Sequence, residues 1–184
     1  MTATRAAQGP ASGGRRLRAR RPASAPSVRR ATAADVPAIA ELLRQVDDVH
    51  ARILPGYFRR PHGDAAASAR LQRTLPAPGD SGTKIILVAV RAGVIGFVLV
   101  QIYDTPDEPD MKPARRAHVE DLVVDRAHRR AGAGTALMKA AAEWARAAGA
   151  DDLILTVWQG NQAAERFYES LGYRPLSRVL HKDL

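Results

Sequence analysis

One segment of this chain constrains its fold more than any other: an apolar strand that runs into a glycine-containing loop and then into a helix. Residues 117–124 form the strand, and Arg129, Gly132 and Gly134 follow it with the spacing R-x-x-G-x-G. The next helix carries its apolar residues on one face and is expected to end at Gly149. Such a loop presents free backbone N–H groups and a helix N-terminus to an anion. The segment therefore predicts a site for the pyrophosphate of a cofactor.

The elements on either side of this segment predict a mixed sheet. Two β-rich runs joined by a short turn predict an antiparallel hairpin, and an apolar strand after the central helix completes a β-α-β unit. The predicted elements are a helix after a cap at residues 32–35, a helix at 65–75, the hairpin at 85–103, the strand at 117–124, a strand at 153–158, a helix at 162–171 capped by Asn161, and a strand at 175–181. This order predicts a mixed α/β fold in which antiparallel strands lead into the β-α-β unit.

Composition excludes several classes of protein. The chain has 184 residues and no cysteine, which excludes a disulfide framework, a thiolate nucleophile and cysteine-ligated zinc. The five histidines show no metal-ligand spacing, so no metal is expected. No apolar run approaches the length of a membrane span, so we expect a cytoplasmic protein without a membrane partner.

The net charge of +9 comes mostly from the N-terminus. Residues 1–28 contain six arginines and no acid, which leaves only +3 for the rest of the chain. Residues 1–27 are rich in Ala, Gly, Ser, Pro and Arg, and are predicted to form a disordered tail before a single domain at residues 28–184. An unselected extension and a weak nucleic-acid-binding arm are both compatible with this tail. No other contact with nucleic acid is expected.

Two common phosphate-binding motifs do not fit the glycine loop. The dinucleotide fingerprint G-x-G-x-x-G needs a third glycine, but Leu137 stands three residues after Gly134. A P-loop needs Gly-Lys-Ser or Gly-Lys-Thr, which the chain lacks. On the loop alone, a strand-to-helix turn that glycine permits is the simpler interpretation.

Two longer stretches change that interpretation. Residues 120–138 (EDLVVDRAHRRAGAGTALM) resemble the central motif of the GNAT superfamily of acetyltransferases, and residues 161–173 (NQAAERFYESLGY) are similar to its N-x-x-A-x-x-F-Y-x-x-x-G-F/Y helix. Residues 29–35 look like the entry to its first helix, so the resemblance covers about residues 28–180. It implies a central mixed sheet with antiparallel N-terminal strands, a splayed parallel pair and flanking helices, and a single N-acetyltransferase domain.

The resemblance also implies a site for acetyl-CoA. The cofactor is expected across the splayed strands, with its pyrophosphate at the loop N–H groups and the helix dipole. The strand backbone is expected to pair with the pantetheine arm and to polarise the thioester carbonyl. Both glycines are expected to permit close backbone approach. The residues implied are Leu122, Val123 and Val124 on the strand, Arg129, Arg130, Ala131, Gly132, Ala133, Gly134 and Thr135 in the loop, and Asn161, which also caps its helix.

Two residues are candidates for catalysis on the same resemblance. Tyr168 matches a tyrosine beside the departing sulfur, where a hydrogen bond to the thiolate is expected to matter more than full proton donation, because a phenol is a weaker acid than a thiol. Glu120 is the candidate base for the amine, and alternation places it on one strand face with Leu122. Residues 119–122 further resemble the spermidine/spermine acetyltransferase branch. A solvated or ion-paired strand carboxylate is the alternative for Glu120.

The acceptor site is expected near the first helices and the strand before the cofactor strand. Tyr57, Phe58 and Asp104 offer aromatic and acidic groups that suit a cationic amine, and a solvated acidic loop is the alternative. The sequence thus predicts acetyl transfer from acetyl-CoA to a primary amine of a small molecule or peptide. Transfer of a longer acyl group, and a non-catalytic acyl-CoA-binding or nucleic-acid-associated module, are the alternatives. A homodimer is left open.

Overall fold

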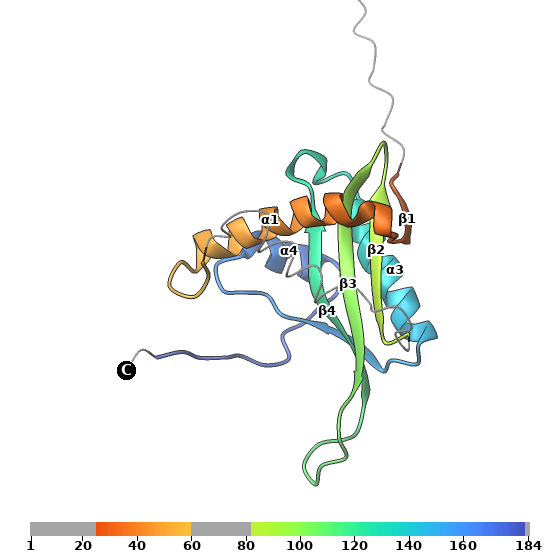
Figure 1. The fold of residues 1–184 in the computed structure, drawn as a ribbon. Helices are drawn as coiled ribbons and strands as arrows, with labels where there is room; N and C mark the ends of the chain where they lie inside the picture. Colours follow the sequence, from red (N-terminus) through yellow and green to blue (C-terminus); the bar gives the residue numbers. More distant parts are fainter. Residues whose placement is uncertain (1–24, 60–81, 183–184) are drawn as a thin grey trace, which may run out of the picture.

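The computed structural model describes residues 25–59 and 82–182 (Figure 1). Its elements are β1 Ser27–Arg30, the short helix η1 Ala33–Asp35, α1 Val36–Ile53, β2 Lys84–Val90, β3 Val94–Asp104, β4 Arg115–Val124, the short helix η2 Arg126–His128, α3 Ala133–Ala147, β5 Asp152–Leu155 and α4 Gln162–Ser170. The helix predicted at residues 65–75 lies outside the described residues, as does the predicted tail up to residue 24.

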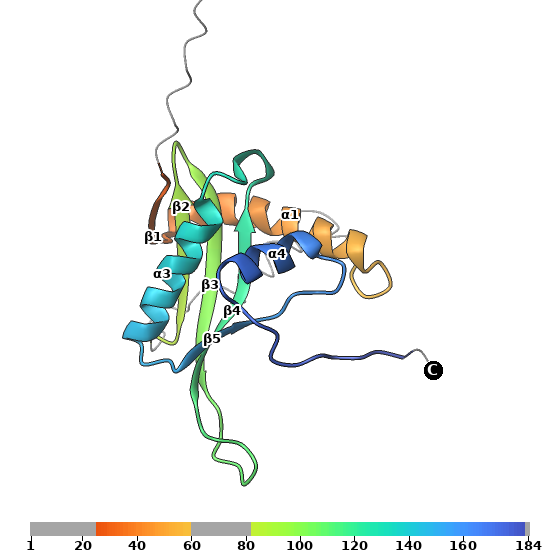
Figure 2. The same cartoon turned by 180° about the vertical axis from the view of Figure 1, so that it is seen from behind.

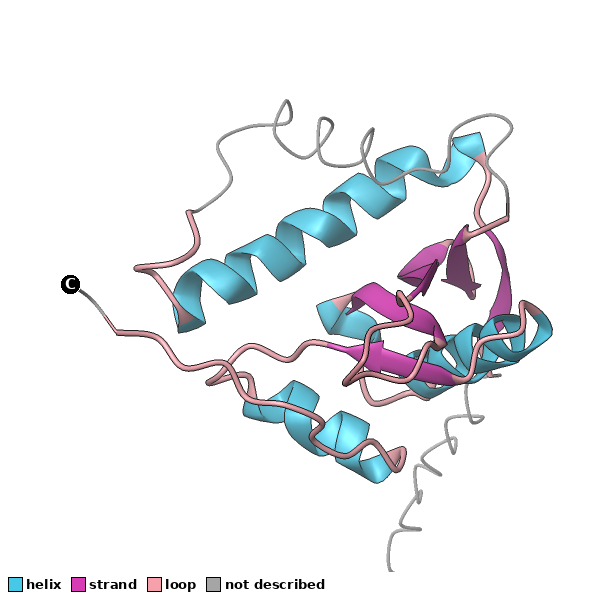
Figure 3. Cartoon of the chain, turned by 90° about the horizontal axis from the view of Figure 1, so that it is seen from below, coloured by secondary structure: helices cyan, strands magenta, loops and turns pink. Residues whose placement is uncertain are grey.

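Five strands form one sheet in the order β1-β2-β3-β4-β5. The pairs from β1 to β4 are antiparallel, and β4 pairs with β5 in parallel. Helix α1 covers one face of the sheet, whereas α3 and α4 lie on the opposite face (Figures 1 and 2). Figure 3 shows the same three layers from below. The predicted mixed α/β fold, with antiparallel strands leading into a parallel pair between helices, is therefore confirmed.

The central strands are apolar almost throughout because both of their faces are covered. In β2, Ile85 and Leu87 pack in the cluster that contains the α3 residues Leu137 and Met138. The alternate residues of β2, with Val88 among them, pack in the second cluster, beneath α1. A continuous apolar run in the sequence is therefore two interleaved core faces in the structure.

Strand β1 adds an element to those predicted. Ser27 pairs with Val90 and Arg30 with Leu87 at one edge of the sheet, so regular structure begins one residue before the predicted domain boundary. Four largely exposed residues give little alternation, which explains why the pattern does not reveal this strand.

A capping box at residues 32–35 leads into α1, as predicted. The Asp35 carboxylate accepts two hydrogen bonds from the Arg29 guanidinium, at 2.7 and 2.9 Å, and one from the backbone N–H of Thr32 at 2.8 Å. Because Asp35 is only 6% exposed, these contacts replace the water that the charge loses. They hold the pKa of Asp35 far below its usual range.

The parallel strands separate after four paired positions. The register of β4 and β5 ends at Val119 and Leu155, so the second half of β4 has no β5 partner within the described part of the chain. The pairing of β4 with β3 also shifts between Leu99 and Val100. Val119 pairs with Val100 and Asp121 pairs with Leu99, which leaves Glu120 as the extra residue of a β-bulge.

The predicted final strand at residues 175–181 is wrong. The described residues after α4 form no strand, and the segment runs away from the body of the protein (Figures 1 and 2). Leu176, Val179 and Leu180 are 76%, 93% and 85% exposed. A strand forms only where a neighbouring edge satisfies its backbone groups, and this segment does not run along β5. Strand-like composition alone could not supply that neighbour.

Among the helices of the described residues, none has the length and the apolar composition needed to cross a membrane.

Candidate active site

The glycine loop has a backbone suited to anion binding. Arg129 is extended, Arg130 has a φ of +58° and Gly132 has a φ of +82°, and α3 begins at Ala133. A turn of this kind can present neighbouring backbone N–H groups to an anion, and the N-terminal dipole of α3 adds to them. A left-handed arginine is strained by about 1 kcal/mol, and such strain is typical of functional loops.

The two glycines of the loop have different roles. A Cβ atom on Gly132 would meet nothing within 4 Å, so this glycine serves the left-handed backbone. A Cβ atom on Gly134 would lie 3.1 Å from Cζ of Phe167. Gly134 therefore lets the first turn of α3 pack closely against α4. The expectation that both glycines permit close backbone approach did not include this contact between helices.

Positive charge gathers at the loop. The Nε group of Arg129 donates a hydrogen bond to the carbonyl oxygen of Val124, at 3.0 Å, and this places the guanidinium beside the end of β4. Partial desolvation lowers the pKa of Arg129, and the nearby charges of Arg126 and Arg52 lower it further, with Asp125 opposing them. Three arginines from two separate elements thus raise the local potential at the N-terminus of α3, where it favours an anion.

Tyr168 lies on α4 in a largely apolar environment. Its ring packs 5.2 Å from that of Phe167 and 5.7 Å from that of Tyr173, measured between ring centroids. Burial raises the pKa of Tyr168 to about 12, and Tyr173 and the charge of Asp121 contribute further. The hydroxyl group is therefore a neutral hydrogen-bond donor throughout the physiological pH range. Asn161 caps this helix as predicted, because its side-chain oxygen accepts from the N–H of Ala164 at 3.3 Å.

The two acids of β4 differ in environment. Glu120 is exposed at the bulge, which interrupts the alternation that would place it regularly on one face with Leu122. Asp121 is 9% exposed and pairs across the sheet with Leu99. Its negative charge contributes to the raised pKa of Tyr168. The sequence interpretation missed Asp121, although an acid at an inward position of an apolar strand is a signal that could have identified it.

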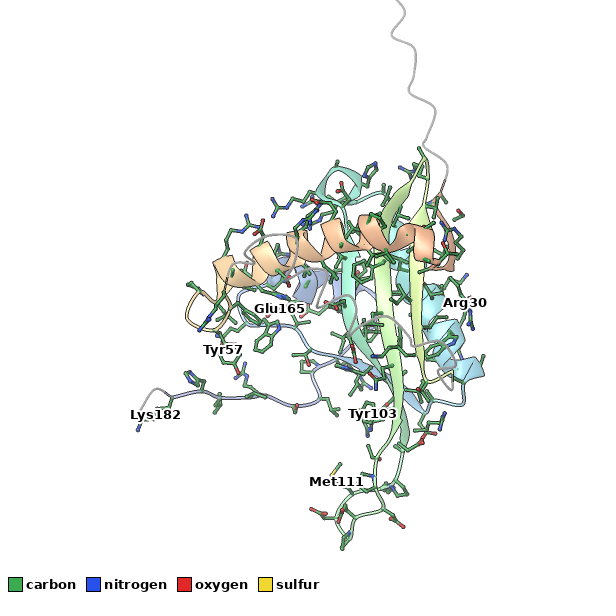
Figure 4. The ribbon with its side chains drawn as sticks, in the orientation of Figure 1. Arg30, Tyr57, Tyr103, Met111, Glu165 and Lys182 are labelled. Atoms are coloured by element: carbon green, nitrogen blue, oxygen red, sulfur yellow. The ribbon has the colours of Figure 1, made fainter. Side chains whose placement is uncertain are left out.

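An aromatic cluster joins the predicted acceptor residues. Tyr57 and Phe58 lie 5.6 Å apart, and the ring of Trp158 lies 5.3 Å from Tyr57 and 4.8 Å from Phe58. His50 contacts Phe58, and His181 lies 6.4 Å from Tyr57. The structure thus places Trp158 in this half-exposed cluster. Tyr57 lies in the turn that follows α1 (Figure 4), with 65% of its surface exposed.

Asp104 does not join this cluster. It lies at the end of β3, and both of its carboxylate oxygens are 3.0 Å from Nη1 of Arg115. Figure 4 places the neighbouring Tyr103 and the Met111 hairpin far from Tyr57. Of the three predicted acceptor residues, Tyr57 and Phe58 are therefore neighbours, whereas Asp104 lies apart from them in an ion pair with Arg115. Within residues 25–59 and 82–182, no group of three or more histidine and acidic side chains could hold a metal ion.

Comparisons with known proteins agree with this geometry. The sequence model of the acetyltransferase (GNAT) family matches residues 49–173. A glucosamine 6-phosphate N-acetyltransferase of Trypanosoma brucei brucei is 39% identical over 104 residues, which are 55% of this chain and 65% of that protein. The chain spans less than two thirds of the length of the curated relatives that it matches.

Solved structures share the fold. The BH1408 protein of Bacillus halodurans, solved as a tetramutant, superposes with a TM-score of 0.75 at 26% identity, over 86% of this chain and 99% of that one. AAC(6')-Iy, solved with the bisubstrate analogue CoA-S-monomethyl-acetylneamine, superposes with a TM-score of 0.63 at 21% identity, over 88% and 99% of the two chains. The family match covers more than half of the chain and includes the glycine loop and α4. The chain therefore belongs to the GNAT family of acetyltransferases.

Proposed function

We propose that this protein transfers an acetyl group from acetyl-CoA to a primary amine of a small molecule or peptide. The observation that carries the proposal is the juxtaposition of three features: the glycine loop before α3, the half of β4 that β5 leaves unpaired, and the half-buried Tyr168 of α4, whose neighbour Phe167 lies against Gly134 of the loop. A relative acts on glucosamine 6-phosphate by its name, and a structural neighbour was solved with a CoA analogue. Both are consistent with a CoA donor and an amine acceptor.

In this proposal the donor lies along β4 and ends at the loop. At the edge of β4 that β5 leaves uncovered, the backbone at Leu122, Val123 and Val124 bonds the pantetheine arm and polarises the thioester carbonyl through its N–H groups, since the carbonyl oxygen of Val124 already accepts from Arg129. The pyrophosphate binds the N–H groups of residues 129–135 at the N-terminus of α3. Asn161 lies at the start of α4 and bonds the pantetheine with the part of its amide that the cap does not use.

Tyr168 stabilises the departing thiolate by a hydrogen bond. A simple thiol has a pKa of about 8.5, so complete transfer of the proton from a phenol of pKa about 12 is uphill by roughly 5 kcal/mol. A hydrogen bond to the thiolate requires no such transfer and strengthens as negative charge develops on sulfur. The raised pKa thus favours Tyr168 as a donor that keeps its proton.

Glu120 is the proposed base. An alkylamine with a pKa near 10.4 is unprotonated in only about one molecule in 2,500 at pH 7, so a nearby carboxylate that accepts a proton promotes attack. Glu120→Gln is expected to lower kcat/KM most at the acidic end of the pH profile, where less free amine is present. The profile is measured between pH 6 and 9 beside that of Asp121→Asn. A Glu120→Gln profile identical to that of the wild type excludes Glu120 as the base.

The aromatic cluster of Tyr57, Phe58 and Trp158 is the proposed acceptor side. Electron-rich ring faces attract an ammonium group and pack against its carbon chain. Tyr57 offers most of the exposed ring surface. Asp104 is left out of this site because Arg115 holds both of its carboxylate oxygens.

The test is a thiol-release assay with acetyl-CoA and a panel of amines: a polyamine, an aminoglycoside, an amino-sugar phosphate, an amino acid and a peptide with a free N-terminus. Amine-dependent release of CoA supports the proposal. Calorimetry with CoA runs in parallel. Binding of CoA without transfer to any acceptor favours the non-catalytic alternative, and longer acyl-CoA donors test the acyl chain length. The salt-dependent DNA affinity of the full chain, compared with a variant lacking residues 1–27, tests the arginine-rich arm.

A homodimer is proposed as the assembly, and a cytoplasmic location stays a prediction. The apolar side chains of Leu176, Val179 and Leu180 are exposed in the single chain, and a second copy is a partner that would cover them. Light scattering measures the oligomeric state. Leu180→Asp is expected to shift a dimer toward monomer, and a monomeric wild-type protein contradicts this proposal.

A further inference from the structure

The middle of α1 is hydrogen-bonded to the start of the glycine loop through one side chain. The Nε2 group of Gln45 donates to Oδ2 of Asp125 at 2.9 Å, and its Oε1 atom accepts from the backbone N–H of Arg126 at 3.3 Å. Gln45 is half-buried and stands eighty residues before Asp125 in the sequence. A single amide thus supplies a donor and an acceptor to two consecutive residues of another element.

Asp125 passes this contact on to the rest of the loop. Its Oδ1 atom accepts from the N–H of Ala127 at 2.8 Å and lies 3.2 Å from Nδ1 of His128, so it caps η2. Its backbone N–H donates to Ile95 of the sheet at 2.9 Å. The hydrogen bond from Gln45 is the largest cause of the lowered pKa of Asp125, so the carboxylate stays charged and keeps all three partners. The segment just before the anion-binding residues is therefore fixed from the sheet and from α1.

We propose that Gln45 is a positioning residue for the donor site. It acts through Asp125 and Arg126, and it holds the chain entering the loop so that the N–H groups around Gly132 keep the arrangement that binds an anion. The inference rests on the proposed binding of acetyl-CoA by this loop. It also gives α1 two functions, because the same helix leads directly into the segment that carries Tyr57 and Phe58 at the proposed acceptor side.

The contact suits an amide for a chemical reason. Glutamate at position 45 would still accept from the N–H of Arg126, but it would place a second carboxylate against Asp125 without a donor between them. Exchanging the amide and the carboxylate group between the two positions restores the pair. In Gln45→Glu/Asp125→Asn, the asparagine amide donates to the glutamate, and the asparagine oxygen remains free to accept from the N–H of Ala127. The double variant has the same net charge as the wild type.

The experiment compares Gln45→Glu, Gln45→Met and the exchanged double variant with the wild-type full chain. Glu41→Gln, at an exposed position one turn earlier on α1, is the matched control. We expect both Gln45 single variants to raise KM for acetyl-CoA and the calorimetric Kd for CoA by about tenfold, the effect of losing one hydrogen bond to a charged group, with kcat changed less than about twofold. The double variant is expected to recover most of the affinity, and the control to match the wild type.

Hydrogen exchange of the ligand-free protein gives an independent readout. Faster exchange of the amides at residues 126–132 in the two single variants, and recovery in the double variant, supports a positioning role. Unchanged CoA affinity in folded Gln45→Met, or failure of the double variant to recover either loop protection or affinity, overturns the inference. A wild-type protein that does not bind CoA refutes the proposed function instead, and the exchange data then report the positioning of the loop by itself.

Discussion

Replacing Tyr168 with phenylalanine removes one oxygen atom from the proposed reaction and little else. The ring contacts with Phe167 and Tyr173, at 5.2 and 5.7 Å, depend on the aromatic ring and remain. Tyr168 lies on α4 and is not among the loop residues that are proposed to bind pyrophosphate. The perturbation therefore separates the chemical step from donor binding and from folding.

The expected magnitude follows from the hydrogen bond that is lost. A hydrogen bond to a charged group contributes about 1.5–3 kcal/mol, which corresponds to a roughly 10- to 150-fold decrease in kcat. The Kd for acetyl-CoA should change less than about twofold, because the thioester in the ground state carries little charge on sulfur. Tyr173→Phe is the matched control, since it removes a hydroxyl group from the neighbouring tyrosine, and it should retain nearly full kcat.

The pH profile tests the same argument through the pKa. A pKa raised to about 12 keeps Tyr168 protonated well above the ordinary range of a phenol, so the hydroxyl group is not lost between pH 9 and 11. Stopped-flow measurement of thiol release should give a rate decrease by the same factor at every pH from 7 to 10. The reasoning is refuted if Tyr168→Phe keeps wild-type kcat, or if the wild type has an alkaline limb near pH 10 that disappears in the variant.

Three substitutions test how the fold supports the site. Asp35→Asn should lower the free energy of unfolding by about 2 kcal/mol at pH 7. Because the folded-state pKa of Asp35 is depressed, its stabilisation is present at neutral pH and is lost as the pH falls below about 4. Urea titrations in which the two proteins differ equally at pH 3 and pH 7 contradict this. Gly134→Ala should displace Phe167, costing about 1 kcal/mol of stability and lowering kcat, since α4 also carries Tyr168; wild-type kinetics would show that α4 adapts freely. Gly96→Ala places a Cβ atom 2.7 Å from the backbone oxygen of Val123, so thermal unfolding should reveal a loss of at least about 2 kcal/mol, and an unchanged Tm would contradict the close approach of β3 and β4.

The features that the sequence predicted correctly depend on neighbours in the chain. The cap at Asn161 and the end of α3 at Gly149, which has a positive φ, are each set within a few residues, where side-chain type and backbone conformation are directly linked. Apolar runs in β2 and β3 identify strands covered on both faces. These local signals, with the two family motifs, were sufficient for a mixed sheet with an antiparallel part and a parallel pair between helices, and they single out the glycine loop as a candidate anion site.

Other features depend on contacts between residues that are distant in sequence. The bulge at Glu120 is a property of the register between two strands, and the charge of Asp121 raises the pKa of Tyr168 only because the fold brings β4 and α4 together. The same holds for Gly134 against Phe167. The sequence permits many possible partners for each of these residues, and only the folded chain selects one of them.

The sequence by itself therefore determined the mixed α/β class, the order of the central elements from β2 to α4 and a loop with the chemistry of an anion site. The tertiary structure alone decided that Asp104 belongs to an ion pair with Arg115, that the segment after α4 is not a strand, and that Gln45 bonds Asp125 and Arg126 at the start of the glycine loop. The physical reason is one of range: backbone dihedrals and caps are fixed by adjacent residues, whereas a hydrogen-bond partner across the fold exists only after packing has brought distant elements together.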